Sequence, residues 1–302
     1  MPKAGFRFKP KRRKTQEHGP DEKPEGIDLS EEDIDVQIKG EKFSALFLGS
    51  FEIDLIRQAL SRFGITQQLK KIGYPELDIQ FRPRGPFEHH LTFRDATDSE
   101  KPLIGEVVLK EGRYHFNTHP IEHGNISGLM LLTIEWILMQ HIKGEFTDGR
   151  PRLPGQNFPG LGIGNQVNDL LTWVARLMHK DGLVNVPEYF HNAVFYDKWF
   201  KFVDPKVQGA MEAIHRHLQE RGHNICEISF AAYFDCLIDE TTGEPYNWVP
   251  HEMVLPLKKE FKAYFKQAQY RQIVEQTRDN LAIAIDESKF AEKMKTADNI
   301  EW

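Results

Sequence analysis

Hydrophobic residues in the first half of the chain alternate between helical and strand-like spacing. Apolar positions from Phe51 to Lys71 recur at helical spacing, with a break at Gly64, and predict one or two amphipathic helices. Strand-like runs stand on either side of this segment: Lys42–Leu48, Leu77–Phe81, His90–Phe93 and Leu103–Leu109. Polar residues 95–101 join the last two runs and predict a hairpin.

The second half begins with the nearly continuous apolar run 129–140, in which we interpret Thr133–Leu138 as a buried strand. The elements predicted after it are a helix from the glycines at 160–164 to Met178, a strand at Leu183–Val186, a helix from Pro187 through Lys198, a helix at 205–220, strands near Cys226–Leu237 and Tyr246–Val254, and a charged helical region from Leu257 to about Phe290. Together these elements predict an α/β (α+β) fold, with helices on both faces of a mixed central sheet and a C-terminal helical extension.

Composition agrees with an intracellular globular protein. The 302 residues, 40% of them hydrophobic, suffice for one large core or two modest ones. No apolar run is long enough to span a membrane and no secretory signal is recognisable, so we expect a cytoplasmic protein. The cysteines, Cys226 and Cys236, are too few for a disulfide framework and lack metal-binding spacing. We expect both to be reduced core residues.

Charge and composition divide the chain into three parts. The net charge is −6, but residues 1–14 hold seven Lys and Arg and no acid, so the rest carries −13. Residues 1–40 are interpreted as a disordered tail, basic and then acidic, 41–256 as the folded domain and 257–302 as the helical extension. The basic segment 1–14 is either a solvated terminus or a contact for an acidic or nucleic-acid partner, and the extension is charged enough for a partner surface.

The segment Pro159-Gly160-Leu161-Gly162-Ile163-Gly164 carries the strongest chemical signal, because it leads directly into a predicted amphipathic helix. Glycines allow backbone N–H groups to approach an anion, and a helix N-terminus adds unpaired N–H groups and a positive dipole end. Phosphate is the expected ligand. No Lys-Ser/Thr pair follows, which excludes a P-loop, and the sixth position of a dinucleotide-binding GxGxxG motif is not glycine.

The order of this loop, its helix, a strand and a tyrosine-bearing helix resembles the central motif of the GNAT acyltransferase superfamily. The likeness covers roughly residues 155–203, with Gly162-Ile163-Gly164 at the end of the family's loop and Tyr196-Asp197-Lys198-Trp199-Phe200 at its tyrosine segment. Pro159 stands where the family usually has Arg or Gln, and Gln156 or Arg152 is the candidate substitute. The resemblance implies a partly splayed sheet and an acyl-CoA donor whose pyrophosphate binds at Gln156 and at Gly160, Leu161, Gly162, Ile163 and Gly164.

The same resemblance assigns the catalytic groups. Tyr196 matches the acid that protonates the departing thiolate, and related enzymes often place a general base on the strand that holds Glu135. Burial of Glu135 in the apolar run would favour the neutral carboxyl over the carboxylate. The alternative interpretation is a strand-end or edge glutamate that faces water. His191, five residues before Tyr196, is the alternative base; its other interpretation is a packed core or rim histidine.

We therefore expect an enzyme that transfers an acetyl or longer acyl group from acyl-CoA, or from an acyl carrier protein, to an amine. The alternative is a non-catalytic protein of the same fold that acts in assembly or regulation through its basic tail and C-terminal helix. His115, His119 and His123 are spaced four apart, but Pro120 and Gly124 interrupt any helix that would align them. We expect no metal site.

Overall fold

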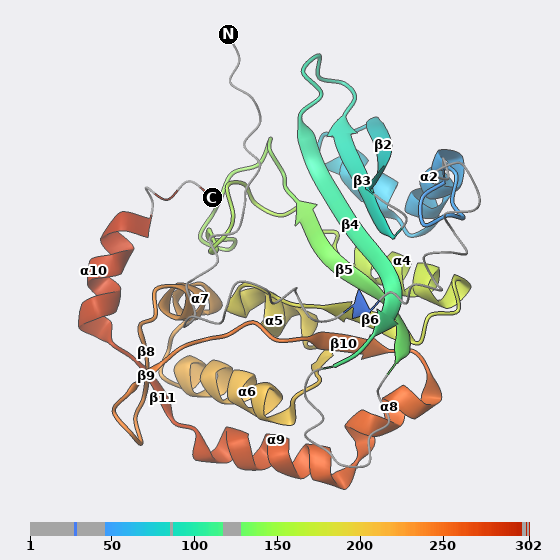
Figure 1. The fold of residues 1–302 in the computed structure, drawn as a ribbon. Helices are drawn as coiled ribbons and strands as arrows, with labels where there is room; N and C mark the ends of the chain where they lie inside the picture. Colours follow the sequence, from blue (N-terminus) through green and yellow to red (C-terminus); the bar gives the residue numbers. More distant parts are fainter. Residues whose placement is uncertain (1–26, 29–45, 85–86, 117–127, 298–299, 301) are drawn as a thin grey trace, which may run out of the picture.

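The computed structural model describes residues 27–28, 46–84, 87–116, 128–297, 300 and 302. One large mixed sheet runs through it in the order β2-β3-β4-β5-β6-β10-β7, with β1 paired to β4 (Figure 1). Its strands are β1 (Ile27–Asp28), β2 (Leu77–Arg84), β3 (Glu88–Asp95), β4 (Leu103–Tyr114), β5 (Leu129–Met139), β6 (Gly182–Asn185), β7 (Lys201–Phe202) and β10 (Met253–Pro256). Among these described strands β5 and β6 are parallel, and the other neighbours are antiparallel. The mixed sheet predicted from the sequence is confirmed.

The first half of the sheet is a meander of antiparallel strands. In β3, alternate residues from His89 to Asp95 are buried, as expected for a strand with one face on the core. β3 pairs with β4 across the polar turn at residues 95–101, so the predicted hairpin is confirmed. This half brings β5 to the centre of the molecule, where the two halves of the sheet meet.

Helices cover both faces of the sheet, as the sequence predicts. On one face α2 (Ile53–Arg62), α3 (Ile65–Lys71) and α4 (Gly164–Leu177) share a core with β3, β4 and β5. On the other face α8 (Lys259–Lys266) and α9 (Ala268–Asn280) bury aromatic residues against Leu131, Val184 and Val254. Within the described residues, every helix is too short or too polar to cross a bilayer.

The C-terminal third adds α5 (Phe190–Tyr196), α6 (Pro205–Glu220), α7 (Ile225–Tyr233) and α10 (Glu287–Ala297). A small antiparallel sheet contains β8 (Leu237–Asp239), β9 (Pro245–Tyr246) and β11 (Ile283–Ile285) in the order β11-β8-β9. The predicted extension from residue 257 thus contains a strand as well as helices. It packs closely on the body, since a Cβ atom on Gly209 of α6 would lie 2.5 Å from the Val274 carbonyl of α9.

Two local predictions near helix starts are wrong. The described end of the predicted strand Lys42–Leu48 is a tight turn in which Phe47 forms an isolated bridge with Phe51, and Leu48 and Gly49 have φ of 50° and 62°. The second helix does not open at Pro187. It begins at Phe190, because the chain is still extended at Tyr189.

The strand predicted over Cys226–Leu237 is mostly helix α7, so the two cysteines do not share a strand. The Asn224 side chain accepts hydrogen bonds from the N–H groups of Cys226 and Glu227, and the Glu227 carboxylate accepts from the Asn224 N–H. This reciprocal capping box starts a helix in an apolar stretch that otherwise resembles a buried strand. Cys226 is half-buried and Cys236 is buried, both as free thiols.

Candidate functional site

The glycine loop at residues 159–164 leads into α4, and two hydrogen bonds fix its first two residues. The His141 N–H donates to the Pro159 carbonyl at 2.6 Å, and the Arg150 guanidinium donates to the Gly160 carbonyl at 2.6 Å. Leu161 and Ile163 are buried, whereas Gly162 and Gly164 between and beside them are exposed. Gly162 has φ of +71°, which favours glycine over other residues. The alternation therefore anchors two side chains and turns glycine backbone outwards.

The backbone N–H groups of residues 161–166 have no acceptor among the described residues. Ile163 occupies the N-cap position of α4 without forming a side-chain cap, and the helix's first bond runs from the Val167 N–H to the Ile163 carbonyl. A Cβ atom added to Gly162 or Gly164 would meet no atom within 4 Å, so the space in front of the loop is open. Unpaired N–H groups at a helix N-terminus favour an anion such as phosphate.

Two cations flank these N–H groups. Lys198 donates from Nζ to the Asn165 side-chain oxygen at 2.5 Å, in the first turn of α4, and lies 3.7 Å from the centre of the Trp199 ring. Arg150 is bonded at the other end of the loop, where it donates to the Gly160 carbonyl. Neither residue was predicted as a ligand from the sequence. Lys198 belongs to the tyrosine segment, but only the fold brings that segment to α4.

Gln156 and Arg152, the candidate substitutes for the missing donor at Pro159, make other contacts. The Gln156 side-chain oxygen accepts from the Leu153 N–H at 3.2 Å. Arg152 donates to the carbonyls of Gln156 and Ile300 at 2.8 and 2.7 Å. These bonds shape the turn at 152–156 and hold the C-terminal segment. The assignment of Gln156 to donor binding stays a prediction, and Arg150 and Lys198 are the cations recorded at the loop itself.

The parallel strands beside the loop separate part of the way along β5. β5 and β6 pair only from Leu131 to Ile134 on β5, opposite residues 182–185, although β5 continues to Met139. In Figure 1 the β4–β5 ribbon runs obliquely to the layer of β6 and β10. Asn185 ends the paired segment, is 6% exposed and has a side-chain oxygen with no partner among the described residues. The split thus leaves the edge of β5 without a neighbouring strand and leaves the buried Asn185 acceptor unpaired.

Glu135 lies at the bulge of β5, just past the split. Ile134 pairs with Leu109 and Trp136 with Val108, so Glu135 is the additional residue that bends the strand. Its side chain is 35% exposed and forms an ion pair with Lys110 Nζ at 3.2 Å. The interpretation in which the apolar run buries Glu135 is therefore wrong. Its proposed role as a base stays a prediction.

Tyr196 ends α5, two residues before Lys198. Its ring lies 6.0 Å from that of Phe200, and burial raises the pKa of the Tyr196 hydroxyl. The hydroxyl has no hydrogen-bond partner among the described residues, and a raised pKa keeps it protonated near neutral pH. The Lys198–Asn165 bond brings this end of α5 to the loop. No recorded interaction of the described residues joins Tyr196 to Glu135.

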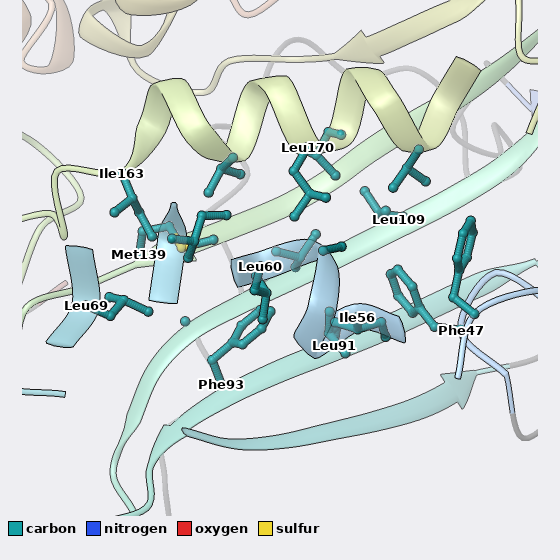
Figure 2. Close-up of a pocket in the computed structure, with 18 of the residues that line it drawn as sticks. Phe47, Ile56, Leu60, Leu69, Leu91, Phe93, Leu109, Met139, Ile163 and Leu170 are labelled. Carbon is teal, nitrogen blue, oxygen red and sulfur yellow. The ribbon is translucent and has the colours of Figure 1, made fainter. Parts of the chain in front are cut away.

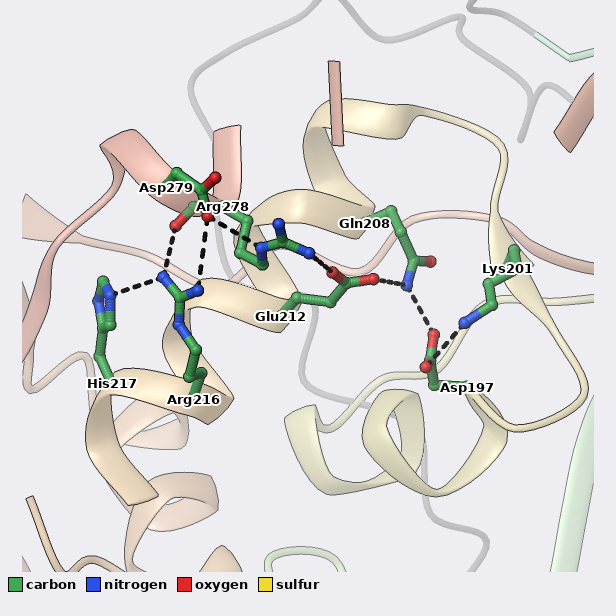
Figure 3. A network of polar contacts seen from close by, with 8 residues as sticks. All are labelled: Asp197, Lys201, Gln208, Glu212, Arg216, His217, Arg278 and Asp279. Carbon is green, nitrogen blue, oxygen red and sulfur yellow. Dashed lines mark hydrogen bonds and ion pairs between the residues drawn. The ribbon is translucent and has the colours of Figure 1, made fainter. Parts of the chain in front are cut away.

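A polar network holds the residue that follows Tyr196 (Figure 3). The buried Gln208 of α6 donates to Asp197 at 2.7 Å and to Glu212 at 2.9 Å, and its oxygen accepts from the Phe202 N–H. Lys201 donates to Asp197 at 2.8 Å. The chain continues from Glu212 through Arg278 and Asp279 to Arg216. The network fixes the end of α5 relative to α6 and α9, and so fixes the position of Tyr196 and Lys198.

His191, the alternative base, is 3% exposed, and its ring stacks on that of Tyr189 at 5.7 Å. Burial lowers the pKa of His191 to about 4, so it is neutral at pH 7, and its Nδ1 is without a hydrogen-bond partner in the described structure. These features agree with a packed histidine.

His119 and His123 lie outside the described residues, as does the basic segment 1–14. The described residues contain no group of three or more His, Cys, Asp or Glu side chains placed to hold a metal ion. No family model matches the chain, and no curated protein sequence matches it. The candidate site consequently rests on the geometry of the loop, the split strands and the tyrosine segment.

Proposed function

We propose that this protein transfers an acyl group from acyl-CoA to an amine. The observation that carries the proposal is the row of unpartnered N–H groups at residues 161–166, with open space at Gly162 and Gly164, and with Arg150 and Lys198 bonded at its two ends. Two phosphates joined as a pyrophosphate match such a row of donors with a cation near each end. The GNAT resemblance of the loop and tyrosine segment adds acyl-CoA as the source of that pyrophosphate.

The separation of β5 and β6 supports the same donor. Pantetheine contains two amide groups, and an extended amide chain forms hydrogen bonds with an uncovered strand edge. β5 presents such an edge toward β6 beyond Ile134, and Asn185 adds an acceptor whose burial makes an unmade hydrogen bond costly. The end of β5 lies beside the loop, because a Cβ atom on Gly160 would be 3.7 Å from the Met139 carbonyl oxygen. One extended ligand could therefore contact both.

In the proposed reaction the amine nitrogen attacks the thioester carbonyl, a C–N bond forms and the C–S bond breaks. Tyr196 is proposed to donate its proton to the departing thiolate. Burial raises the pKa of its hydroxyl, so the proton is present at neutral pH. Glu135, directly or through water, is proposed to take the proton that the amine loses. Its 35% exposed side chain remains accessible to solvent.

The competing proposal is a non-catalytic protein of the same fold that acts in assembly or regulation. Pro159 favours it, because the loop lacks one backbone donor there. Assembly through the C-terminal extension is less favoured. The packing of α9 on α6 and the pairing of β11 with β8 already use residues of this extension that a partner would need.

Donor binding separates the two proposals. Calorimetric titration with CoA and acetyl-CoA should show binding to the wild-type protein and a loss greater than tenfold in Gly162→Glu, because each bond to a charged phosphate contributes roughly 1.5–3 kcal/mol. The new carboxylate would also repel phosphate. Gly243→Glu is the matched control, as Gly243 is exposed, has no neighbour within 4 Å and has a similar φ of +73°. Equal binding by both variants would contradict the loop assignment, and absence of binding by the wild-type protein would favour assembly.

The turnover rate tests the assignment of Tyr196 as the general acid. Tyr196→Phe should lower kcat by roughly 10²–10⁴ with nearly unchanged CoA affinity, since it removes a transferable proton and little else. Tyr264→Phe removes a buried hydroxyl that donates to the Val203 carbonyl on the far face of the sheet, and should keep kcat. Rates from an acceptor screen would check both variants. Wild-type turnover in Tyr196→Phe would remove Tyr196 from the mechanism.

A further inference from the structure

An apolar cavity of about 70 Å³ lies between β3, β4 and the helices α2, α3 and α4 (Figure 2). No polar atom faces it. Four of its lining residues reach solvent (Leu55, Met139, Leu170 and Trp173), and most of the others are buried. Because an apolar cavity of this kind stays dry and accepts apolar guests, its natural occupant is a hydrocarbon group.

The cavity borders the proposed donor site at both ends. Leu161 and Ile163, the buried side chains of the glycine loop, form part of its wall beside Met139. At its other end it is lined by Leu109, which pairs with Ile134 next to the bulge at Glu135. The loop therefore presents backbone N–H groups outward and apolar side chains to the cavity.

Gly105 keeps the cavity open in the middle of β4. A Cβ atom there would lie 3.4 Å from the Met139 sulfur, 3.4 Å from Phe93 Cδ2 and 3.3 Å from the Leu138 carbonyl oxygen. Glycine weakens a strand interior and is retained where another group approaches closely. A substituted residue at this position would narrow the space between Phe93 and Met139.

The shape and volume of the cavity limit the ligands that it can hold. A cavity of about 150 Å³ accepts benzene, so one of about half that volume is too small for an aromatic ring. Gly105 and Leu109 both line it, and four residues of strand span about 13 Å, so the space is long relative to its volume. A narrow apolar slot of this kind fits a short unbranched chain.

We propose that this cavity holds the hydrocarbon end of a short unbranched acyl group, such as butanoyl, carried by the donor thioester. The inference rests on the proposed function, because the thioester comes from acyl-CoA. It makes the protein selective for short aliphatic acyl groups over both acetyl and aromatic ones.

The test compares the affinities of CoA, acetyl-CoA, butanoyl-CoA and benzoyl-CoA for the full-length protein by calorimetry. Butanoyl-CoA adds two methylene groups to acetyl-CoA, and burial of each should tighten binding roughly fourfold, or about 15-fold together. Benzoyl-CoA should bind no more tightly than acetyl-CoA. In Ala59→Leu, which places three more carbon atoms on a wall residue, the butanoyl preference should fall below about twofold while CoA affinity stays unchanged.

Two further variants complete the experiment. Ala263→Leu makes the same exchange at an exposed position of α8 and should keep the preference. Val174→Ala enlarges the cavity from α4 and should extend the preference to hexanoyl-CoA, which keeps the inference testable if Ala59→Leu does not fold. Equal binding of acetyl-CoA and butanoyl-CoA, or a preference that survives Ala59→Leu, would overturn the cavity inference while CoA binding leaves the proposed function standing. Absence of binding by CoA and all thioesters would overturn the proposed function and this inference with it.

Discussion

Helices α4 and α7 begin in opposite ways. At α7, the Asn224 side chain and the Glu227 carboxylate pair with backbone N–H groups and close the helix start with groups of the chain itself. At α4, Ile163 turns a buried side chain to the core, and the N–H groups of the first turn face open space between two cations. A helix start without a cap therefore indicates a binding site when it is also exposed and flanked by charge of one sign.

The largest expected effect is on the pH dependence of stability. It tests whether a polar atom without a hydrogen-bond partner is enough to mark a functional site. His191 also has an unpartnered nitrogen, but its pKa is lowered to about 4 by burial against an ordinary value of 6.5. The unfolded state binds the proton first on acidification, so stability is lost as the pH falls from about 6.5 toward 4, by up to about 3 kcal/mol. His191→Phe should flatten this part of the profile and leave CoA binding at pH 7.5 unchanged.

Urea unfolding of the wild-type protein and of His191→Phe between pH 7.5 and pH 4.5 would measure the effect. Loss of CoA binding in His191→Phe at pH 7.5, in a variant that remains folded, would return His191 to the candidate site.

The next effect tests the charge beside α4. Lys198→Glu replaces the cation at Asn165 by an anion and should weaken CoA binding by roughly tenfold or more, since one charge-assisted hydrogen bond contributes about 1.5–3 kcal/mol. Lys262→Glu changes an exposed lysine of α8 in the same way and should bind CoA as wild type does. Titration at two salt concentrations would check the electrostatic cause, because added salt should shrink the difference. An unchanged affinity would remove Lys198 from the site.

The smallest expected effect is on the free energy of unfolding, and it tests the capped N-terminus of α7. Asn224→Ala removes the cap of α7 and should lower the free energy of unfolding by about 1 kcal/mol, without any change in CoA affinity. Asn224→Asp keeps an acceptor at the cap and should recover most of the stability. Urea denaturation with CoA titration of each variant makes the measurement. A change in CoA affinity in Asn224→Ala would show that the two helix starts are coupled. It would contradict the view that the start of α7 only stabilises the fold.

The sequence predicted the features that depend on neighbouring residues. The helix after Gly164 and the turn at Gly162 follow from local spacing and backbone freedom. The cap of α7 was also present as Asn224 and Glu227 three positions apart, but the apolar run that follows favoured a strand. Patterns among neighbouring residues therefore predict most of the helices and strands and the glycine loop. The helix start at Asn224 was also visible in the sequence but was interpreted as part of a strand region.

Features that depend on the packing of distant segments could not be predicted. Glu135 lies in an apolar run, yet β6 ends beside it and Lys110 comes from the neighbouring strand, so its side chain reaches solvent. Lys198 reaches Asn165 only because α5 and α4 meet in space. No sequence spacing encodes either distance, and both decide how the candidate site is charged.

The glycine at position 209 has a consequence for the order in which the chain folds. Its bare backbone faces Val274, about 65 residues later in the sequence. At a synthesis rate of 5–20 residues per second, α6 leaves the ribosome roughly 3 to 13 s before that part of α9 exists. During this interval the face of α6 that α9 will cover is exposed to water and to other nascent chains. The synthesis of α9 therefore sets the time at which this face is protected from aggregation.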